Sequence, residues 1–283
     1  MAIPPDTSIG PVSLTIRDLD RMQDFYGGVL GLRTLERDGS RATFGVEDGR
    51  PLVDLVRDAK APDRPPGTTG LFHLAVLVPT RCNLAEALRR LADAHWPLAG
   101  ASDHLVSEAL YLDDPEGNGI EIYRDRPREQ WRHEGDEIAM ATHPLDLQSL
   151  IGGLDGKAAD KLPGGTRIGH VHLNVANLEA AEAFYAGLLG FDVTARGYPG
   201  ALFVSAGGYH HHIGLNTWTG EGASPPAAAS VGLRAFEVVL PNRKELEQLT
   251  DRLQGAGAEV GLQDGTATLR DPSENRVVLT TWA

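Results

Sequence analysis

Three polar residues together have the chemistry of a divalent metal site: His73, Glu121 and His170. Each stands in a short, mostly apolar segment with the pattern of a strand. Side chains alternate between the two faces of a strand, and each of these residues lies opposite the face that should pack against a helix. Two imidazoles and one carboxylate form a facial triad with open positions for substrate and oxygen, which is typical of mononuclear iron(II) sites. The same donors suit Mn(II), Zn(II), Co(II) and Ni(II), so the residues predict a metal site and favour Fe(II) within it.

An internal repeat distinguishes these three residues from the pattern that both copies share. Residues 12–31 match 171–190 with an offset of 159, 70–79 match 232–241 with an offset of 162, and 114–118 match 271–275 with an offset of 157. The partner copies carry Pro11, Ala235 and Val278 at the positions that correspond to His170, His73 and Glu121. A purely structural role should look alike in both copies. The asymmetry favours a functional role over three polar residues that are merely satisfied within a cleft.

The repeat divides the chain into four units, each predicted to contain a strand, a helix and about three more strands. We place the units at 8–60, 68–125, 166–220 and 230–283. Two halves, 1–125 and 166–283, are then joined by a linker at 126–165. Helices are expected at 84–94 and 245–256, with a short one at 144–154 in the linker. Strands joined by tight turns, with helices between them, predict an α+β fold with mostly antiparallel sheets.

Composition narrows the classes of function. The chain has 283 residues and a formal net charge of -13, with a single cysteine, Cys82. The acidic balance argues against a nucleic-acid or anionic membrane partner, which would need clustered Lys and Arg. No segment has the length and apolarity of a membrane helix, and the N-terminus lacks the pattern of a secretory signal. With no second cysteine for an intrachain disulfide, we expect a cytoplasmic protein in which Cys82 is not a nucleophile.

Five segments resemble the vicinal-oxygen-chelate superfamily, which includes glyoxalase I, bleomycin-resistance proteins and extradiol dioxygenases. They are GLFHLA at 70–75, YLDDPEGNGIE at 111–121, IGHVHL at 168–173, FYAGLLG at 184–190 and GGYHHHIGL at 207–215. The chain is most similar to the catechol 2,3-dioxygenase-like branch with four βαβββ modules. The resemblance implies that the modules pair into two curved, incompletely closed mixed β-barrels with the helices outside.

The resemblance also assigns roles to residues. In extradiol dioxygenases one module gives a His from its first strand, and its partner gives a His and a Glu, which here implies that the second and third units pair. It also implies that His211 acts as the acid–base and that His104 and Tyr111 contact substrate or oxygen. Strand alternation alone leaves open which residue of the run 210–212 faces the metal. We predict that His172, His210 and His212 contact substrate, with His172 also open as a competing ligand.

These features predict an extradiol ring-cleaving dioxygenase that acts with O2 on a catechol- or hydroquinone-type diol at a mononuclear Fe(II). The expected partners are a small aromatic substrate and O2, and a homodimer stays open. One alternative is a metal-dependent isomerase or lyase of glyoxalase type, which the resemblance links to a second carboxylate ligand. The other is a non-enzymatic binder of bleomycin-resistance type, which the resemblance links to the absence of a metal triad.

Overall fold

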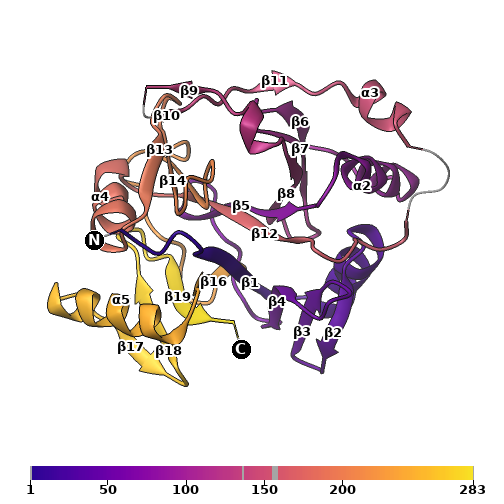
Figure 1. The fold of residues 1–283 in the computed structure, drawn as a ribbon. Coiled ribbons are helices and arrows are strands. Elements are labelled where there is room, and N and C mark those ends of the chain that lie inside the picture. The colour runs from indigo at the N-terminus through magenta and orange to yellow at the C-terminus, as the bar shows by residue number, and fades with distance from the viewer. Residues whose placement is uncertain (1, 136, 155–158, 283) are drawn as a thin grey trace.

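The structure, a computed structural model, describes residues 2–135, 137–154 and 159–282 and contains the four expected modules (Figure 1). The first module contains β1 (Ser8–Ile16), α1 (Leu19–Gln23), η1 (Asp24–Val29), β2 (Arg33–Arg37), β3 (Arg41–Gly45) and β4 (Pro51–Arg57). The second contains β5 (Gly70–Leu77), α2 (Arg81–Asp93), β6 (Gly100–Asp103), β7 (Ser107–Asp113) and β8 (Gly119–Asp125). The third contains β12 (Arg167–Asn174), α4 (Leu178–Glu182), η3 (Ala183–Leu188), β13 (Asp192–Ala195), β14 (Ala201–Ser205) and β15 (Ile213–Asn216). The fourth contains β16 (Gly232–Leu240), α5 (Arg243–Gly255), β17 (Gly261–Gln263), β18 (Thr266–Arg270) and β19 (Arg276–Thr281).

The modules combine across the two halves of the chain. The first and fourth form an eight-stranded sheet in the order β17-β18-β19-β16-β1-β4-β3-β2. The second and third form a nine-stranded sheet in the order β11-β6-β7-β8-β5-β12-β15-β14-β13, in which β11 (His143–Pro144) comes from the linker. Within each module the first strand runs parallel to the last, and the remaining pairs are antiparallel. This α+β arrangement of curved, incompletely closed mixed sheets confirms the expected fold and module pairing, while the division into halves at 126–165 stays a prediction.

The helices cover the outer faces of the sheets (Figure 1). Helices α2 and α5 begin earlier than expected because Thr80 and Asn242 cap them, each accepting a hydrogen bond from a backbone N–H of the first turn. Leu74 and Val76 of β5 join the main apolar cluster beneath the helices. Ala75 of the same strand belongs to a separate small cluster on the opposite face. The predicted strand faces are therefore confirmed for β5. Among the described residues no helix has both the length and the apolar character needed to cross a membrane.

The linker is more structured than the sequence suggested. It contains the expected short helix α3 (Leu147–Gly152), and also η2 (Arg128–Gln130), β9 (His133–Glu134) and β10 (Glu137–Ile138). Strand β11 pairs with β6 at the edge of the nine-stranded sheet. Trp131 and Ile138 pack with Tyr209 of the third module in a small apolar cluster. The linker thus joins the second and third modules by direct packing as well as by chain connection.

The eight-stranded sheet carries a different polar cluster on the face that matches the triad. The Asp54 carboxylate accepts hydrogen bonds from Ser13 Oγ at 3.0 Å and from Thr43 Oγ1 at 3.2 Å, and it pairs with Arg41. Burial, together with the negative charge of Asp54, raises the pKa of Glu237 to about 6. A carboxyl group whose pKa is raised in the folded state destabilises the fold once it ionises.

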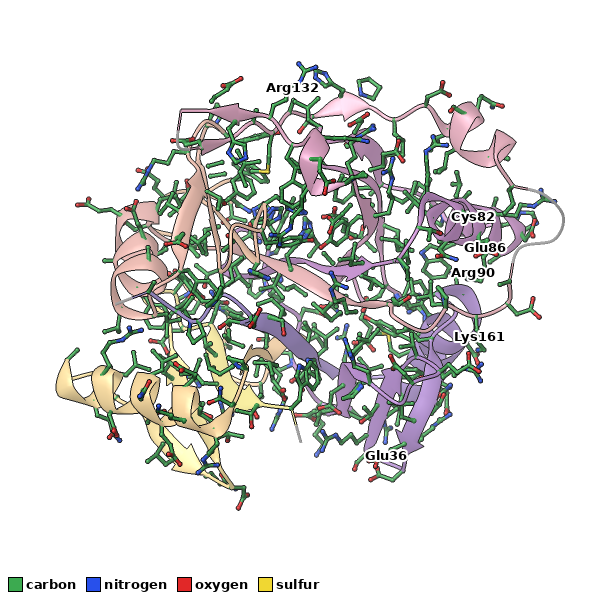
Figure 2. The ribbon with its side chains drawn as sticks, in the orientation of Figure 1. Glu36, Cys82, Glu86, Arg90, Arg132 and Lys161 are labelled. Atoms are coloured by element: carbon green, nitrogen blue, oxygen red, sulfur yellow. The ribbon has the colours of Figure 1, made fainter. Side chains whose placement is uncertain are left out.

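We therefore expect Glu237→Gln to stabilise the protein at pH 7.5 by about 1 kcal/mol, after a discount for partial exposure. Because the folded pKa lies above the unfolded value, this gain should appear as the pH rises from 4.5 through 6 and vanish below 4.5. Urea unfolding at pH 4 and pH 7.5 measures it. Glu36→Gln, at an exposed position on β2, is the matched control and should change stability at neither pH (Figure 2). An equal effect of Glu237→Gln at both pH values would contradict the assignment.

Candidate metal centre

The triad predicted from the sequence comes together at the centre of the nine-stranded sheet. Ala75 on β5 pairs with Glu121 on β8 and with His170 on β12, and His73 lies two residues back along β5. The alternation of side chains therefore places all three residues on one face of three adjacent strands. All three are buried, with exposed fractions between 2% and 5%. They form the group of potential metal ligands found within the described residues.

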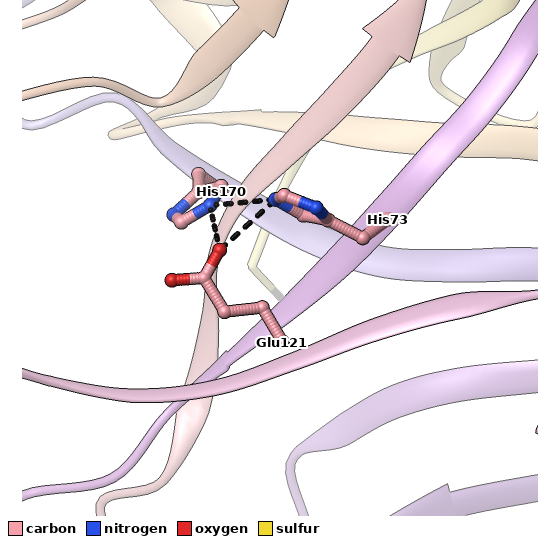
Figure 3. Close-up of side chains that lie close together, drawn as sticks. All are labelled: His73, Glu121 and His170. Carbon is pink, nitrogen blue, oxygen red and sulfur yellow. Dashed lines mark hydrogen bonds and ion pairs between the residues drawn. The ribbon is translucent and has the colours of Figure 1, made fainter. Parts of the chain in front are cut away.

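The donor atoms of the triad converge (Figure 3). Glu121 Oε2 lies 3.0 Å from His73 Nε2 and 3.0 Å from His170 Nε2, and the two imidazole nitrogens lie 3.3 Å apart. Donors about 2.1 Å from an ion at right-angled positions would lie about 3.0 Å from one another. The triangle therefore fits three facial ligands of a six-coordinate divalent metal, with the opposite positions left to other groups.

The ionisation states also suit metal binding. Burial alone would raise the pKa of Glu121, but the His170 and His73 imidazoles hold it well below its usual range, so the carboxylate is ionised. Burial lowers the pKa of His170 to about 4, which keeps that imidazole neutral at pH 7. Metal ligands must be an ionised carboxylate and neutral imidazoles, so Glu121 and His170 already have the net charges that metal binding requires.

The triad opens onto a cavity of about 380 Å³. The sequence predicted seven of the residues that line it: His73, His104, Tyr111, Glu121, His170, His172 and His211. It missed the aromatic and apolar part of the wall, which includes Phe72, Met140, Tyr198, Phe203 and Trp218. Met140 comes from the linker, and Tyr198 and Trp218 come from loops of the third module. No periodic pattern marks such residues, because they are brought to the site by tertiary packing alone.

Two β-bulges explain how the strands present their side chains. The pairing of β5 with β12 shifts between Ile168 and His170 and again opposite Phe72, so that Gly169 and Phe72 are the extra residues. The first bulge lets Ile168 join the core while His170 faces the cavity. The second lets Phe72 and His73, which are neighbours in sequence, both line the cavity. Bulges next to functional sites commonly re-aim side chains in this way.

Gly169 has a second role. A Cβ atom at this position would lie 1.8 Å from the Tyr123 hydroxyl oxygen and 3.1 Å from Leu77 Cβ. The Tyr123 ring packs against His170 with their centroids 4.8 Å apart. The absence of a side chain at Gly169 is thus what allows Tyr123 to lie beneath the triad.

His104 and Tyr111 form a hydrogen-bonded pair in the cavity wall. His104 Nδ1 lies 2.7 Å from the Ala141 carbonyl oxygen, which can only accept, so Nδ1 carries the hydrogen. In the neutral ring Nε2 then accepts from the Tyr111 hydroxyl at 2.7 Å. Tyr111 lies opposite Glu121 in the β7–β8 register, and burial followed by the charge of Glu121 raises its pKa well above the usual value. The pair therefore presents a neutral phenol beside the triad, and its predicted contact with substrate or oxygen stays a prediction.

The run 210–212 lies in the connection before β15, which begins at Ile213. His211 lines the cavity, and its ring centroid lies 4.1 Å from that of His170. His210 is fully buried and bonds Asp125, while His212 Nδ1 accepts from the Ala206 N–H at 3.1 Å. Neither His210 nor His212 is among the described residues that line the cavity. The geometry therefore gives no support to the predicted contacts of His210 and His212 with substrate.

His172 does line the cavity, at the wall beyond His73. Its ring lies 5.0 Å from that of His73 and 5.4 Å from that of Trp218, centroid to centroid. Its Nε2 is buried and has no hydrogen-bond partner among the described residues. It is not a member of the converging donor group, which favours substrate contact over metal binding for His172. Cys82 lies on α2 at the surface, away from the cavity (Figure 2).

The sequence matches a known protein family over most of the chain. The sequence profile of the Glyoxalase/Bleomycin resistance protein/Dioxygenase superfamily matches residues 8–122 and 167–279. The two matched segments correspond to the two copies of the internal repeat, and the linker falls between them.

Individual relatives agree with this match. A protein named catechol-2,3-dioxygenase from Bacillus subtilis (strain 168) is 42% identical over 277 residues, which is 96% of each chain. A solved structure from Bacillus subtilis subsp. subtilis str. 168, provisionally described as a dioxygenase, has a TM-score of 0.70 at 16% identity and covers 100% of this chain and 87% of that one. Glyoxalase I from Zea mays has a TM-score of 0.59 at 16% identity, with coverage of 97% and 92%. At these identities the two solved structures show a shared fold.

Proposed function

Because the chain belongs to the Glyoxalase/Bleomycin resistance protein/Dioxygenase superfamily, we propose that it is an extradiol ring-cleaving dioxygenase acting on an aromatic diol. The observation that carries this proposal is the converging triad of two imidazoles and one carboxylate in a buried cavity. The relative named catechol-2,3-dioxygenase, at 42% identity over nearly the whole chain, supports the same reaction. In that reaction both atoms of O2 enter the product, and the ring opens next to the diol.

His73, Glu121 and His170 would hold the metal, which we propose to be Fe(II). Such an ion supplies Lewis-acid polarisation of the diol and the redox chemistry that dioxygen requires. The protein keeps Glu121 ionised and His170 neutral, and it encloses them in a mostly apolar wall. The second carboxylate ligand associated with glyoxalase-type enzymes is not part of the donor group within the described residues.

The remaining cavity residues would handle protons and orient the diol. Burial and the neighbouring histidines lower the pKa of His211 well below its usual value, so His211 is neutral and can accept a hydroxyl proton. The Tyr111 hydroxyl and His104 form a hydrogen-bonded polar pair next to Glu121. Phe203 packs edge-on against the His211 ring, with centroids 4.9 Å apart.

The cavity wall indicates which diols fit. Its described lining contains no lysine or arginine, and its charged members, Asp113 and Glu121, are acidic. A substrate with a carboxylate substituent would find no counter-charge there and would lose its hydration on entry. A cavity of about 150 Å³ suffices for benzene, so this larger one has room for a diol ring with an apolar substituent. We therefore infer that the preferred substrates are uncharged diols.

Oxygen uptake after anaerobic loading with Fe(II) tests both points. Catechol, 3-methylcatechol and 2,3-dihydroxybiphenyl should consume one O2 per ring and give a yellow ring-opened product. Carboxylated 3,4-dihydroxyphenylacetate should have a kcat/KM at least about 10-fold lower, the cost of one unpaired buried charge. Hydroquinone tests the other diol pattern in the same assay. The proposal fails if iron-loaded protein consumes no oxygen with any diol. Isomerisation of a glutathione hemithioacetal without oxygen would point to the glyoxalase-type reaction instead.

A further inference from the structure

A chain of hydrogen bonds runs from the cavity wall to a carboxylate at the end of β8. His211 Nδ1 lies 2.8 Å from His210 Nδ1, and His210 Nε2 lies 2.9 Å from Asp125 Oδ1. Asp125 is the last residue of the strand that carries Glu121, whereas the two histidines come from the third module. None of these bonds involves the triad, and neither Asp125 nor His210 lines the cavity.

The donor in each of these hydrogen bonds can be assigned by starting at Asp125. An ionised carboxylate can only accept, so His210 Nε2 carries the hydrogen that Asp125 receives. The uncharged imidazole tautomer with hydrogen on Nε2 has its lone pair on Nδ1. Because two lone pairs cannot share a hydrogen bond, His211 Nδ1 must be the donor to His210. The other nitrogen of His211, Nε2, is left with its lone pair and without a hydrogen.

Asp125 is itself held in place. The Tyr209 hydroxyl lies 3.1 Å from each of its carboxylate oxygens, and the Tyr123 hydroxyl lies 2.7 Å from that of Tyr209. With Tyr209 donating to Asp125, Tyr123 donates to Tyr209, so every donor in this second chain also points toward the carboxylate. Trp131 of the linker packs against the His210 ring with centroids 5.3 Å apart. Burial, the two hydrogen bonds and the contact with Trp131 hold the His210 ring in one orientation.

We propose that Asp125 and His210 are positioning residues that fix the tautomer of His211, with hydrogen on Nδ1 and the lone pair on Nε2. In this tautomer His211 can accept a proton from a group in the cavity, whereas the opposite tautomer could only donate there. The role of that proton acceptor rests on the proposed dioxygenase function, but the tautomer itself does not. In serine proteases a carboxylate fixes the tautomer of the reacting histidine in this way, and replacing that carboxylate by an amide lowers kcat.

Asp125→Asn should reverse the direction of the hydrogen bonds between residue 125, His210 and His211. The amide oxygen would still accept from Tyr209, so the amide nitrogen would face His210 Nε2 and donate to it. His210 Nδ1 would then carry hydrogen and donate to His211 Nδ1, which moves the His211 hydrogen to Nε2. The shape of the site is conserved in this variant, and only the direction of the bonds changes.

Long-range 1H–15N spectra of the Zn(II)-loaded protein, with 15N-labelled histidine, distinguish the two tautomers without any turnover. The wild-type protein should show His211 protonated on Nδ1, and Asp125→Asn should show it protonated on Nε2. Tyr209→Phe is the matched control, because it removes a bond to Asp125 but keeps the carboxylate, and it should retain the wild-type tautomer. A wild-type His211 protonated on Nε2 would overturn the proposal, and this measurement needs no variant to fold.

Kinetics of the Fe(II)-loaded protein give a second, separate readout. Asp125→Asn should lower kcat about 100-fold with KM changed less than about 3-fold. The reason is that Nε2 of His211 then carries a hydrogen and cannot accept a proton, while the shape of the cavity is unchanged. An unchanged kcat together with the reversed tautomer would show that His211 is not the base that the proposed function requires. An unchanged tautomer would overturn the inference and leave the proposed function standing.

Discussion

Replacing His170 by alanine is expected to abolish metal binding, although His73 and Glu121 remain. The variant His170→Ala removes one of three donors whose atoms lie 3.0–3.3 Å apart, and the two that remain cannot define a facial site. Loss of residues that only support metal ligands costs about 10- to 100-fold in affinity, so loss of a ligand should cost at least about 100-fold. Oxygen uptake with catechol should fall by about 1000-fold or more. Metal content per chain after Fe(II) loading and desalting measures the first effect.

His172→Ala is the matched control for that experiment. His172 lies on the same strand, two residues from His170, and lines the same cavity, but it is not part of the converging donor group. This variant should retain about one metal per chain. Full metal occupancy in His170→Ala would contradict the site, and loss of metal in His172→Ala would mean that His172 is the ligand in place of one of the three.

Loss of the His211 imidazole should remove catalysis and leave the metal bound. In His211→Asn the amide nitrogen can still donate to His210, whereas the cavity loses the basic Nε2. General-base catalysis by a positioned side chain is worth about 10²- to 10⁴-fold, so kcat should fall within that range. Stopped-flow measurement of oxygen consumption by iron-loaded protein checks it.

His212→Asn provides the comparison for His211→Asn. The amide oxygen can replace Nδ1 of His212 as the acceptor for the Ala206 N–H, and the residue lies outside the cavity. Its kcat should stay within about 3-fold of the wild-type value, as expected for a change remote from the reacting groups. Equal losses in the two variants would assign the effect to the connection before β15 as a whole rather than to one base.

The triad could be predicted from the sequence because its positions obey the alternation of regular strands. Glu121 lies in a regular stretch of β8, and His73 and His170 follow the two-residue period with the residues after them, just past the bulges at Phe72 and Gly169. The other copy of the repeat lacks a ligand at each of the three positions. The pairing of the second and third modules is implied instead by the resemblance to extradiol dioxygenases, and the sheet order confirms it.

Alternation fails where the strand is irregular or absent. The bulge at Phe72 turns that side chain to the cavity, although its position in the strand would place it on the other face. The histidines at 210–212 precede β15, so no strand period applies to them, and tertiary contacts with Asp125 and Ala206 orient His210 and His212. Met140 lines the cavity because the linker packs across the second and third modules, which no local pattern in 126–165 indicates.

The order of the modules in the two sheets has a consequence for how the chain folds. The sheet that carries the triad is built from one continuous stretch, β5 to β15, whereas the other sheet needs β1 and β16, from near opposite ends of the chain, to pair. Closing a longer loop costs more conformational entropy, and pairings distant in sequence form more slowly. The inner pair of modules should therefore assemble first, while the outer pair must wait for the C-terminal strands to emerge from the ribosome. Along the chain, the segments that form the sheet with the triad therefore lie between the segments that form the sheet completed last.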